Sequence, residues 1–407
     1  MIEFVEDVIE ETLIASIKVV GIGGAGGNTV NSMIDAHYKT NYKGIEFIVA
    51  NTDAQALNLS KADHKIQLGI KSTKGLGAGA NPELGKRSAE EDLSRIMDHL
   101  EDADIVFLTG GMGGGTGSGA LPVIARALKE KNILSIAVVT KPFTFEGKKR
   151  AKVAHDALEA LKSVVDTLLI VPNQKLLEVV GQEVSMIDAF AMINSILNQS
   201  VKGIADIISK PGHINVDFAD VRTIMKDMGM AVMGTGRSVG PNRASDAAIA
   251  AISSPLLENM SIKGAKGVLL NISGGPNLGL HEVSLAASII YEQADPDASI
   301  ILGSVIDAAL GDEVIVTIIA TGFEQSIPAM HVHVGTSYAK KNDEFQMYPT
   351  TRDRTEIPLK DAVDSVNTKR QPEAEALNVQ GIDAIDMNDM DVPSFMRVLP
   401  KQVAETE

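Results

Sequence analysis

Residues Leu108–Ala120 read Leu-Thr-Gly-Gly-Met-Gly-Gly-Gly-Thr-Gly-Ser-Gly-Ala, and this stretch decides the fold of the chain. An apolar run, Ala103–Leu108, precedes it, and a helical pattern follows from Leu121 to Lys129. Glycine lets the backbone approach an anion closely, and a helix N-terminus directs N–H groups and a partial positive charge at it. The order of strand, glycine-rich turn and helix therefore predicts a phosphate-binding loop rather than a flexible linker.

The composition of the whole chain narrows its class. Its 407 residues exceed the roughly 250–300 that one core accommodates, so we expect two domains and a tail. The formal net charge of −16 argues against nucleic acid as a partner, because a phosphate backbone requires a basic surface. The chain contains no cysteine, which excludes disulfides and thiolate chemistry. We expect a cytoplasmic protein without membrane insertion, since neither a signal-peptide pattern nor a long apolar run is present.

A second glycine-rich turn, Gly21–Asn28, follows the β-branched run Ile14–Val20 and precedes a helical pattern that ends near Ile34. It contains G-x-G-x-x-G between a strand and a helix, which on its own predicts a dinucleotide-binding unit. In that interpretation Asp53, after the expected strand Ile45–Ala50, binds the ribose. An NAD(P)-dependent Rossmann oxidoreductase is therefore the main alternative function.

Further glycine-rich turns argue against a dehydrogenase. A third turn, Gly75–Arg87, leads into the helix expected at Pro82–His99 but lacks the Ser or Thr of a Walker loop. Alternating strands and a helix continue the parallel sheet at Ile133–Thr140, Gly147–Leu161 and Thr167–Val171. A dehydrogenase needs one phosphate loop, whereas several at one sheet edge predict a nucleotide di- or triphosphate held by backbone amides.

A long, largely buried helix is predicted for residues 185–208, because apolar residues recur there every three or four positions. The loop that follows carries Asn215, Asp217 and Asp220. These acids have two interpretations. Asp217 could cap the helix that begins near Phe218 and Asp220 could favour its first turn, or both could serve catalysis.

The remainder of the chain predicts a second α+β domain and a tail. Helices are expected at Ser245–Ile252 and Glu282–Glu292, and strands at Gly267–Ile272, Ser299–Val305 and Glu313–Ala320. Only Asp307–Gly311 separates the last two strands, which predicts an antiparallel hairpin. Residues 326–390 are polar without a persistent apolar face and are expected to be a disordered linker. Apolar anchors in Asp391–Lys401 predict a peptide that docks on a partner.

These motifs resemble the bacterial tubulin-like cell-division GTPases, the FtsZ family, over about residues 14–323 and the terminal peptide. The tubulin signature Gly-Gly-Gly-Thr-Gly-Ser-Gly stands at Gly113–Gly119. Further shared motifs lie at Gly21–Asn28, Asn51–Leu57, Gly75–Glu91, Thr140–Glu146 and Asn215–Arg222. The resemblance implies an α/β fold in which a Rossmann-like parallel-sheet GTPase domain is joined by a long central helix to a smaller α+β domain.

The expected division of the chain follows from the patterns and the resemblance together. It comprises a mobile N-terminal segment (1–13), a GTP-binding domain (14–183), the central helix (184–210), a C-terminal domain with the catalytic loop (211–325), the linker (326–390) and the partner-binding peptide (391–401).

The resemblance also implies a nucleotide site for GTP and GDP. It assigns the phosphates to Gly24, Ala25, Gly26, Gly27, Asn28, Gly115, Thr116 and Gly117. Glu146 and Arg150 look like the ribose and phosphate contacts. Asn173 and Asn194 look like the readers of the guanine edge, and Phe190 packs against the base. Mg²⁺ would arrive with the nucleotide, since the chain shows no dedicated metal cluster.

In the same resemblance Asp217 and Asp220, with Asn215 beside them, look like the acids that polarise the hydrolytic water. Asn194 and Asp217 are separated by roughly 15 helical residues, or about 20 Å. If both belong to one active site, the acids must come from the next subunit. Hydrolysis then requires head-to-tail stacking, and contacts that do not close give filaments.

The family further implies a contractile ring at the midcell division site, with membrane-tethering and regulatory division proteins bound to Asp391–Lys401. A scaffold that binds nucleotide only for assembly is a third possibility, which the intact acidic loop argues against. Three places depart from the family. The connection His37–Tyr42 is longer than expected, Asn194 stands where members vary between Asn and Asp, and Met396 and Val398 replace the usual Leu and basic residue.

Overall fold

The computed structural model describes residues 15–36, 45–179, 184–209, 214, 216–257 and 262–323. All of these residues belong to one compact unit, Met1–Met330. The expected N-terminal segment (1–13), the connection 37–42, the linker (326–390) and the terminal peptide (391–401) lie outside the described residues.

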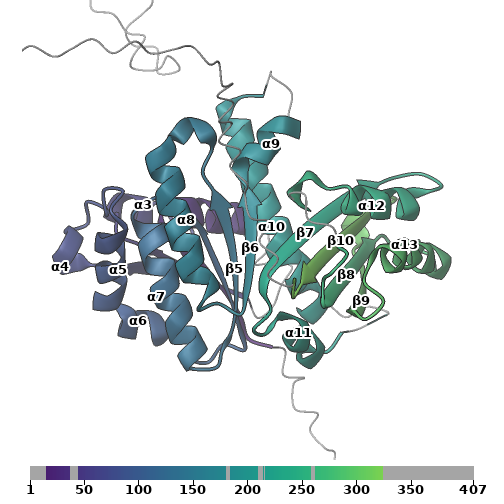
Figure 1. Ribbon diagram of the computed structural model, residues 1–407, viewed down its shortest axis with the longest axis horizontal. Coiled ribbons are helices and arrows are strands. Elements are labelled where there is room, and N and C mark those ends of the chain that lie inside the picture. The colour runs from purple at the N-terminus through teal and green to yellow at the C-terminus, as the bar shows by residue number, and fades with distance from the viewer. Residues whose placement is uncertain are drawn as a thin grey trace, which may run out of the picture. The chain divides into compact units, whose positions relative to one another are not determined.

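A ten-stranded sheet runs through the described part of the chain in the order β3-β2-β1-β4-β5-β6-β7-β10-β8-β9 (Figure 1). The strands are β1 (Ile17–Ile22), β2 (Ile45–Asn51), β3 (His64–Gln67), β4 (Ile105–Gly111), β5 (Leu134–Lys141), β6 (Thr167–Pro172), β7 (Gly229–Ser238), β8 (Gly267–Gly274), β9 (Ser299–Ile306) and β10 (Val314–Thr321). Neighbours pair in parallel except at β10, which is antiparallel to both β7 and β8. The predicted α/β class with a mostly parallel sheet is confirmed.

Helices cover both faces of this sheet. They are α1 (Gly23–Asp35), α3 (Ala54–Asn58), α4 (Ile70–Thr73), α5 (Pro82–Glu91), α6 (Leu93–Met97), α7 (Thr116–Glu130), α8 (Lys148–Lys162), α9 (Asn173–Val179), α10 (Met186–Ser209), α11 (Phe218–Met225), α12 (Arg243–Ile252) and α13 (Leu280–Gln293), with short 3₁₀ turns at Thr144–Glu146, Pro255–Leu257 and Ala308–Leu310. Side chains of α5, α6, α7 and α8 pack on one face of β1–β6, and those of α1 and α10 pack on the other. Strand β1 is accordingly buried along its whole length and β4 along all but its last residue, as expected for parallel strands covered on both faces.

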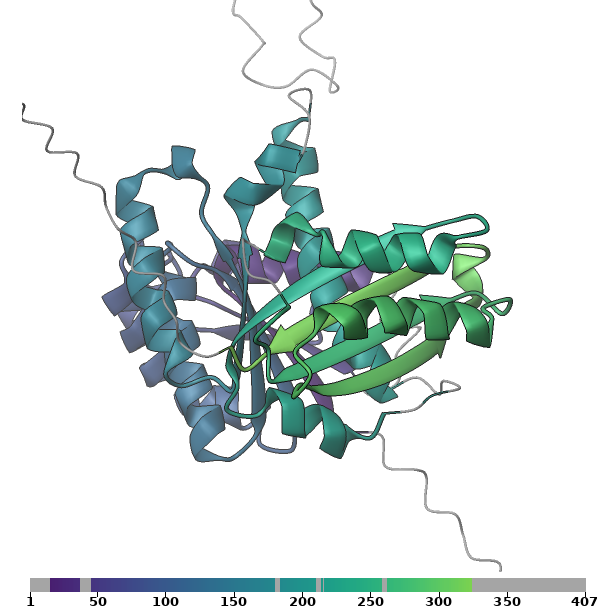
Figure 2. The ribbon, with the colours of Figure 1, turned by 45° about the vertical axis from the view of Figure 1, so that its right-hand side comes forward.

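Helix α10 contacts both halves of the sheet. Its apolar residues Ile193, Leu197, Val201 and Ile204 are all buried in a core that also includes Leu269 of β8. On the opposite face of the C-terminal strands, α12 and α13 lie side by side (Figure 2). The long helix that the sequence predicts is therefore present, and its 24 residues extend about 36 Å. The expected burial holds only for its later part, because Met186, Ile187 and Phe190 in its first turns are exposed.

The expected hairpin of the last two strands is wrong. β9 pairs in parallel with β8 through the crossover helix α13, while β10 lies between β7 and β8. Every residue of β8 is buried, so this strand needs a partner on each edge, and β9 and β10 take opposite edges. β9 lies at the edge of the sheet, and several of its residues are therefore exposed or only partly buried. A short connection thus joins two strands that are not neighbours.

β7 and the helical region Pro82–His99 also differ from the sequence prediction. β7 is not anticipated, because its glycines weaken the strand pattern; a methyl group at Gly234 or Gly236 would overlap carbonyl oxygens of α12. The single helix expected at Pro82–His99 is divided into α5 and α6 at Asp92, which has φ −111° and ψ 15°. The Asp92 carboxylate accepts a hydrogen bond from the Gly69 backbone N–H at 2.7 Å, which ties the break to a neighbouring loop.

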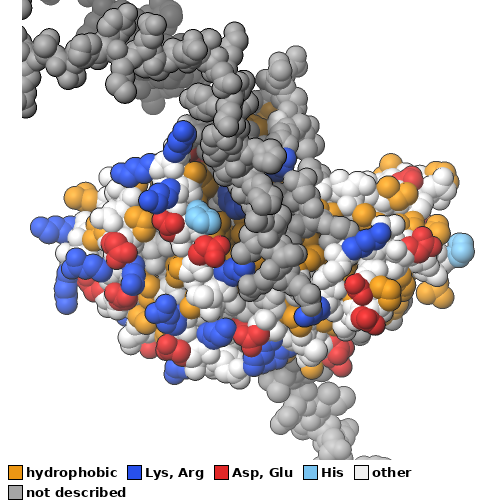
Figure 3. Space-filling view, viewed as in Figure 1, with side chains coloured by type: hydrophobic (Ala, Val, Ile, Leu, Met, Phe, Trp, Pro, Cys, Tyr) orange, Lys and Arg blue, Asp and Glu red, His pale blue; other side chains and the backbone are white. Residues whose placement is uncertain are grey.

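The charged surface shows no continuous basic stripe on the face drawn in Figure 3, where Lys and Arg side chains are interspersed with Asp and Glu. This distribution agrees with the acidic composition, with 53 Asp and Glu residues against 37 Lys and Arg. Within the described residues, no helix combines the length and the apolar character that crossing a bilayer requires.

Candidate nucleotide-binding and catalytic sites

Two glycine-rich loops meet at the carboxyl edge of the sheet. β1 and β4 are neighbours, β1 runs directly into α1 at Gly23, and β4 reaches α7 at Thr116 after a short loop. Neither helix has a side chain that caps its N-terminus. The N–H groups of both first turns therefore face this edge without a side-chain acceptor, and both helix dipoles add partial positive charge. Paired in this way, the two termini form a binding site for an anion.

Glycine is required where these loops pack against each other. A methyl group at Gly26 would overlap the carbonyl oxygen of Thr109, and one at Gly117 would lie 2.5 Å from the carbonyl oxygen of Gly111. Gly23 has φ +72°, a conformation that side chains rarely adopt. Close backbone packing therefore holds the first loop against β4 and folds the β4–α7 loop back on the end of its own strand.

Helix α5 packs against the loop that joins β4 to α7, on the side away from the cavity. A methyl group at Gly85 would overlap the carbonyl oxygen of Gly115, and one at Gly119 would overlap that of Pro82. In front, the Ser118 hydroxyl accepts a hydrogen bond from the Gly113 N–H at 2.8 Å. These contacts hold the loop in one shape between two helices.

A cavity of about 500 Å³ opens above the two loops. Most of the residues assigned to the nucleotide line it, namely Gly24, Ala25, Asn28, Gly115, Thr116, Gly117, Glu146, Arg150, Asn173, Phe190 and Asn194. Gly26 and Gly27 are not among the lining residues and pack instead toward β4 and Val49. A cavity of this volume, with convergent polar groups, suits a ligand of nucleotide size.

One end of the cavity is polar and aromatic. Asn173 begins α9, is 5% exposed, and has a side-chain oxygen without a hydrogen-bond partner. Asn194 on α10 accepts a hydrogen bond from the Thr29 hydroxyl at 3.2 Å. Phe190 meets Phe143 edge to face, with ring centroids 5.7 Å apart. An amide oxygen beside an aromatic face is an arrangement that can recognise the edge and plane of a base.

Glu146 and Arg150 stand at another wall of the cavity. The Arg150 guanidinium donates a hydrogen bond to the Glu146 carboxylate across one helical turn. The other Glu146 oxygen accepts the Phe143 N–H at 2.9 Å, which fixes the carboxylate at the cavity wall. A carboxylate and a guanidinium held together can bind a hydroxyl and a phosphate of one ligand.

The predicted catalytic acids lie elsewhere. Asp217 is the residue before α11 and Asp220 is in its first turn, and both are exposed. The Asp217 side chain makes no capping hydrogen bond, so the structural interpretation of this acid is not realised. Asn215 lies outside the described residues.

The acids and the cavity lie at opposite ends of β5. Arg222 of α11 donates a hydrogen bond to the carbonyl oxygen of Asn132, just before this strand, at 3.1 Å. Thr140, near the end of the strand, lines the cavity. The intervening strand spans about 25 Å, and Figure 1 shows α9 and α11 at opposite edges of the sheet.

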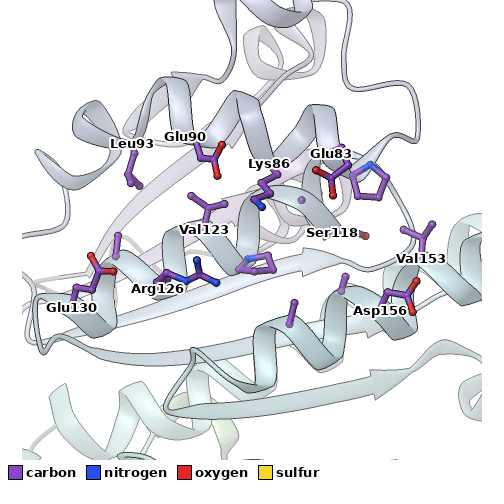
Figure 4. Close-up of a pocket in the computed structure, with 16 residues that line it drawn as sticks. Glu83, Lys86, Glu90, Leu93, Ser118, Val123, Arg126, Glu130, Val153 and Asp156 are labelled. Atoms are coloured by element: carbon purple, nitrogen blue, oxygen red, sulfur yellow. The ribbon is translucent and has the colours of Figure 1, made fainter.

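Figure 4 shows a second cavity, of about 490 Å³, between α5, α7 and α8. Its charged residues include Glu83, Glu90, Glu130 and Asp156 against Lys86 and Arg126. The excess of acids makes this cavity unsuitable for a polyphosphate. Among the described residues, no group of three or more His, Cys, Asp or Glu side chains is placed to hold a metal ion.

Several residues that line the nucleotide-sized cavity are absent from the sequence prediction. Thr29 lies one turn after Ala25 on α1, and Thr140 and Pro142 follow from the end of β5. The position of Thr140 at a strand's carboxyl end is a signal that could have identified it.

A parallel sheet with two glycine-rich helix N-termini at its carboxyl edge defines a nucleotide-binding protein. Comparison of the chain with known protein families gives its class as a tubulin-type GTPase. Residues 16–181 match the model of the Tubulin/FtsZ family, GTPase domain, and residues 229–324 match that of the FtsZ family, C-terminal domain. The chain therefore binds and hydrolyses GTP, and the match assigns its glycine loops to a GTPase rather than to a dehydrogenase.

The chain belongs to the FtsZ family. An FtsZ dimer from M. jannaschii is 43% identical, with a TM-score of 0.72, over 76% of this chain and 88% of that one. A point variant of the same FtsZ gives the same identity and TM-score over 91% of its length. CetZ2 from Haloferax volcanii shares the fold at 21% identity, with a TM-score of 0.64, over 77% of this chain and 94% of that one.

Proposed function

We propose that the chain assembles head to tail and hydrolyses GTP at the junction between two subunits. The observation that carries this proposal is the separation of about 25 Å between the cavity and the helix that bears Asp217 and Asp220. At that distance a carboxylate cannot reach the nucleotide of its own chain. A stack that places the acids of one subunit over the cavity of the next completes the site, and such a contact repeats without closing.

Exposed apolar side chains near the cavity support this stacking. Phe145 precedes Glu146 and is 67% exposed, and Ile187, in the first turn of α10, is 81% exposed. Leu76 is 87% exposed and lies in the loop before α5, which packs against Gly115 through Ala78 and Asn81. Large apolar side chains gathered around a ligand site are typical of a surface that another protein covers.

Each group in the completed site has one task in this proposal. Gly24, Ala25, Asn28 and Gly115–Gly117 bind the phosphates, with backbone amides as the main donors. Glu146 and Arg150 bind the ribose and a phosphate, and Asn173, Asn194 and Phe190 recognise guanine. Asp217 and Asp220 of the neighbouring subunit, with Asn215, polarise the attacking water. Mg²⁺ would enter with the nucleotide and neutralise phosphate charge, which suits a cavity whose lining offers the carboxylate of Glu146 alone.

The proposed cellular role is a contractile ring of such filaments at the midcell division site, in the cytoplasm. Two similar structures are themselves assemblies, an FtsZ dimer and a CetZ2 protofilament with GTPγS. Residues 14–183 bind GTP in this proposal, 184–210 join the two domains, and 211–325 carry the acids to the neighbour. Residues 391–401 bind membrane-tethering and regulatory division proteins at the end of the linker 326–390.

The first test measures phosphate release per subunit against protein concentration. The rate should rise steeply at the concentration where filaments appear in sedimentation and negative-stain images. A constant specific activity down to high dilution would contradict hydrolysis at a junction.

The second test is Asp220→Ala, which should bind GTP normally and hydrolyse it at least about 100-fold more slowly. Mixed with wild type, it should co-assemble and lower the total rate. Asp297→Ala, at an exposed acid in the turn before β9, is the matched control and should hydrolyse GTP like wild type. Normal turnover by Asp220→Ala would rule out this acid.

A further inference from the structure

Helix α11 is anchored at the end opposite to its acids. The last four carbonyl groups of any helix lack a donor within the helix, and a buried carbonyl without a partner is unfavourable. Ile224 and Met225 end α11 and are buried, with 1% and 0% exposure. Their carbonyl oxygens accept hydrogen bonds from two threonine side chains on different strands.

The two threonines belong to different halves of the sheet. Thr321, on β10, donates its hydroxyl proton to the Ile224 carbonyl oxygen at 2.7 Å and lies 3.3 Å from that of Gly267. Thr167, on β6, donates to the Met225 carbonyl oxygen. Both threonines are almost fully buried, at 0% and 1% exposure. The end of α11 is therefore held from the GTP-binding strands and from the C-terminal strands at once.

The turn after α11 is held in the same way. The Asp227 N–H donates to the Asp166 carboxylate at 3.4 Å, and the Gly229 N–H donates to the Asp166 carbonyl oxygen at 2.8 Å. Lys129 forms an ion pair with Asp227 at 3.0 Å. At the other end of the helix, Asp217 makes no capping hydrogen bond. The far end of this eight-residue helix therefore helps to set the location of the acids, together with the buried Val216 and Val221 beside them.

We infer that Thr167 and Thr321 are positioning residues for GTP hydrolysis. Their hydroxyls fix α11 along its axis, and the helix transmits that position to Asp217 and Asp220. A helix is stiff along its axis, so a displacement of its last turn moves its first turn by a similar amount. The inference rests on the proposed function, in which these acids act on the nucleotide of the neighbouring subunit.

The test uses Thr167→Val and Thr321→Val, which remove each hydroxyl while preserving the shape of the side chain. The hydrolysis rate per assembled subunit should fall about ten- to a hundredfold, because small misplacements of catalytic groups have effects of this size. The affinity of the monomer for GTP and the KM should stay unchanged. Thr167→Ser and Thr321→Ser retain the donor and should restore most of the rate.

Thr235→Val is the matched control. This threonine lies on β7, and its buried hydroxyl has no hydrogen-bond partner, so its removal should leave the rate unchanged. Wild-type hydrolysis by the Thr167 and Thr321 valine variants would overturn the inference. So would a loss of rate that the serine variants do not restore.

Mixing the valine variants with wild type separates a misplaced acid from general damage. If a variant fails only because its Asp217 and Asp220 are misplaced at the neighbour's nucleotide, the hydrolysis rate per co-sedimented subunit should fall in proportion to the mole fraction of the variant. If its own nucleotide cavity is also damaged, each variant impairs two junctions and the fall should be close to quadratic. A quadratic fall would overturn the inference.

Further comparisons separate an effect on folding from a failure of the proposed function, hydrolysis at the junction between subunits. If valine prevents folding, Thr→Ala and Thr→Ser are compared at the same position. Equal rates for that pair, or no folded variant without the hydroxyl at either position, would assign the hydroxyls to folding and overturn the inference. If wild type itself shows no dependence of rate on assembly, the proposed function fails, whatever the threonine variants do.

Discussion

Asn173 shows at the scale of a single residue how the cavity is prepared for a ligand. Its side-chain oxygen is buried and lacks a hydrogen-bond partner, although it lies at the wall of a polar cavity. A buried acceptor in that state is unfavourable in the free protein. In the proposed site, a base that donates a hydrogen bond to this oxygen would remove the penalty, and part of the affinity for the nucleotide would come from the new bond.

We predict that Asn173→Leu lowers the affinity for GTP about ten- to a hundredfold, which corresponds to about 1–3 kcal/mol. The change removes an unpaired acceptor, so the melting temperature of the nucleotide-free protein should fall no further than in the control. The control is Asn271→Leu, at a buried asparagine of β8 whose side-chain oxygen is also unpaired. Isothermal titration and thermal unfolding measure both quantities. Equal GTP affinities for the two variants would exclude Asn173 as a base contact.

The residue pattern alone indicates a phosphate end of the cavity, whereas the base end is indicated only by the family resemblance. Glycine loops bind through their own backbone, so a continuous stretch such as Gly113–Gly119 contains the whole signal. Asn173 and Asn194 come from separate helices, and only the family resemblance indicates that they converge. Thr29 is missed because its position depends on how α1 packs against α10.

At the scale of elements, a partly buried ion pair joins the starts of α12 and α13. Arg243 is 7% exposed and donates two hydrogen bonds to Glu282, at 2.8 and 2.9 Å. It also donates to the Asp312 carbonyl oxygen at 2.9 Å, just before β10. The hydrogen bonds from Arg243 lower the pKa of Glu282 to about 2, against an ordinary value of 4.5.

This pKa fixes the pH range in which the pair stabilises the fold. A carboxylate with a lowered pKa in the folded state contributes stability fully above its unfolded pKa of 4.5. That contribution is lost as the pH falls from about 4.5 toward 2.

We predict that Arg243→Met lowers the free energy of unfolding by about 2–3 kcal/mol at neutral pH, because a charged group loses its donor. The variant should also lose the part of the acid dependence between pH 4.5 and 2 that Glu282 provides. Urea unfolding across this pH range measures both effects. The double variant Arg243→Met/Glu282→Leu should recover part of the loss, since no carboxylate is left unpaired. A double variant no more stable than Arg243→Met would contradict this account.

Strand order is the part of the fold that local sequence could not predict. The ranges of β8, β9 and β10 are anticipated nearly to the residue, yet the hairpin assigned to β9 and β10 is wrong. Pairing depends on which edges of β8 are free once α13 has crossed over, and no local pattern records that. β7 is missed for a related reason, since its glycines serve close packing with α12 rather than strand propensity.

At the scale of the whole molecule, the sheet is continuous from the GTP-binding strands to the C-terminal ones. Only three residue pairs, from Thr167↔Gly229 to Leu169↔Ala231, join β6 to β7. Helix α10 strengthens this seam by packing on strands from both sides of it. Within the described residues, the hydrophobic cores contain side chains from β1 through β10, and Phe323 packs against one of them.

We therefore predict that a chain truncated after residue 325 folds, assembles and hydrolyses GTP at the wild-type rate per subunit. The reason is that β10 completes the sheet and the hydrophobic cores described here. Circular dichroism, sedimentation with GTP and phosphate release check the three properties. A second truncation, which removes only residues 391–407, should match it in all of them. Loss of assembly in the longer truncation alone would place residues 326–390 in the filament.

The packing of α5 on α7 makes Gly85 sensitive to mutation although it does not line the nucleotide cavity. Gly85 lies on a helix whose residues do not line the nucleotide cavity, yet there is no room for a methyl group between it and the carbonyl of Gly115. Any side chain at this position must displace Gly115, which lines the nucleotide cavity. The permitted choices at residue 85 are thus limited by the shape of a cavity that the residue does not line, and a list of the cavity-lining residues alone would class it as neutral.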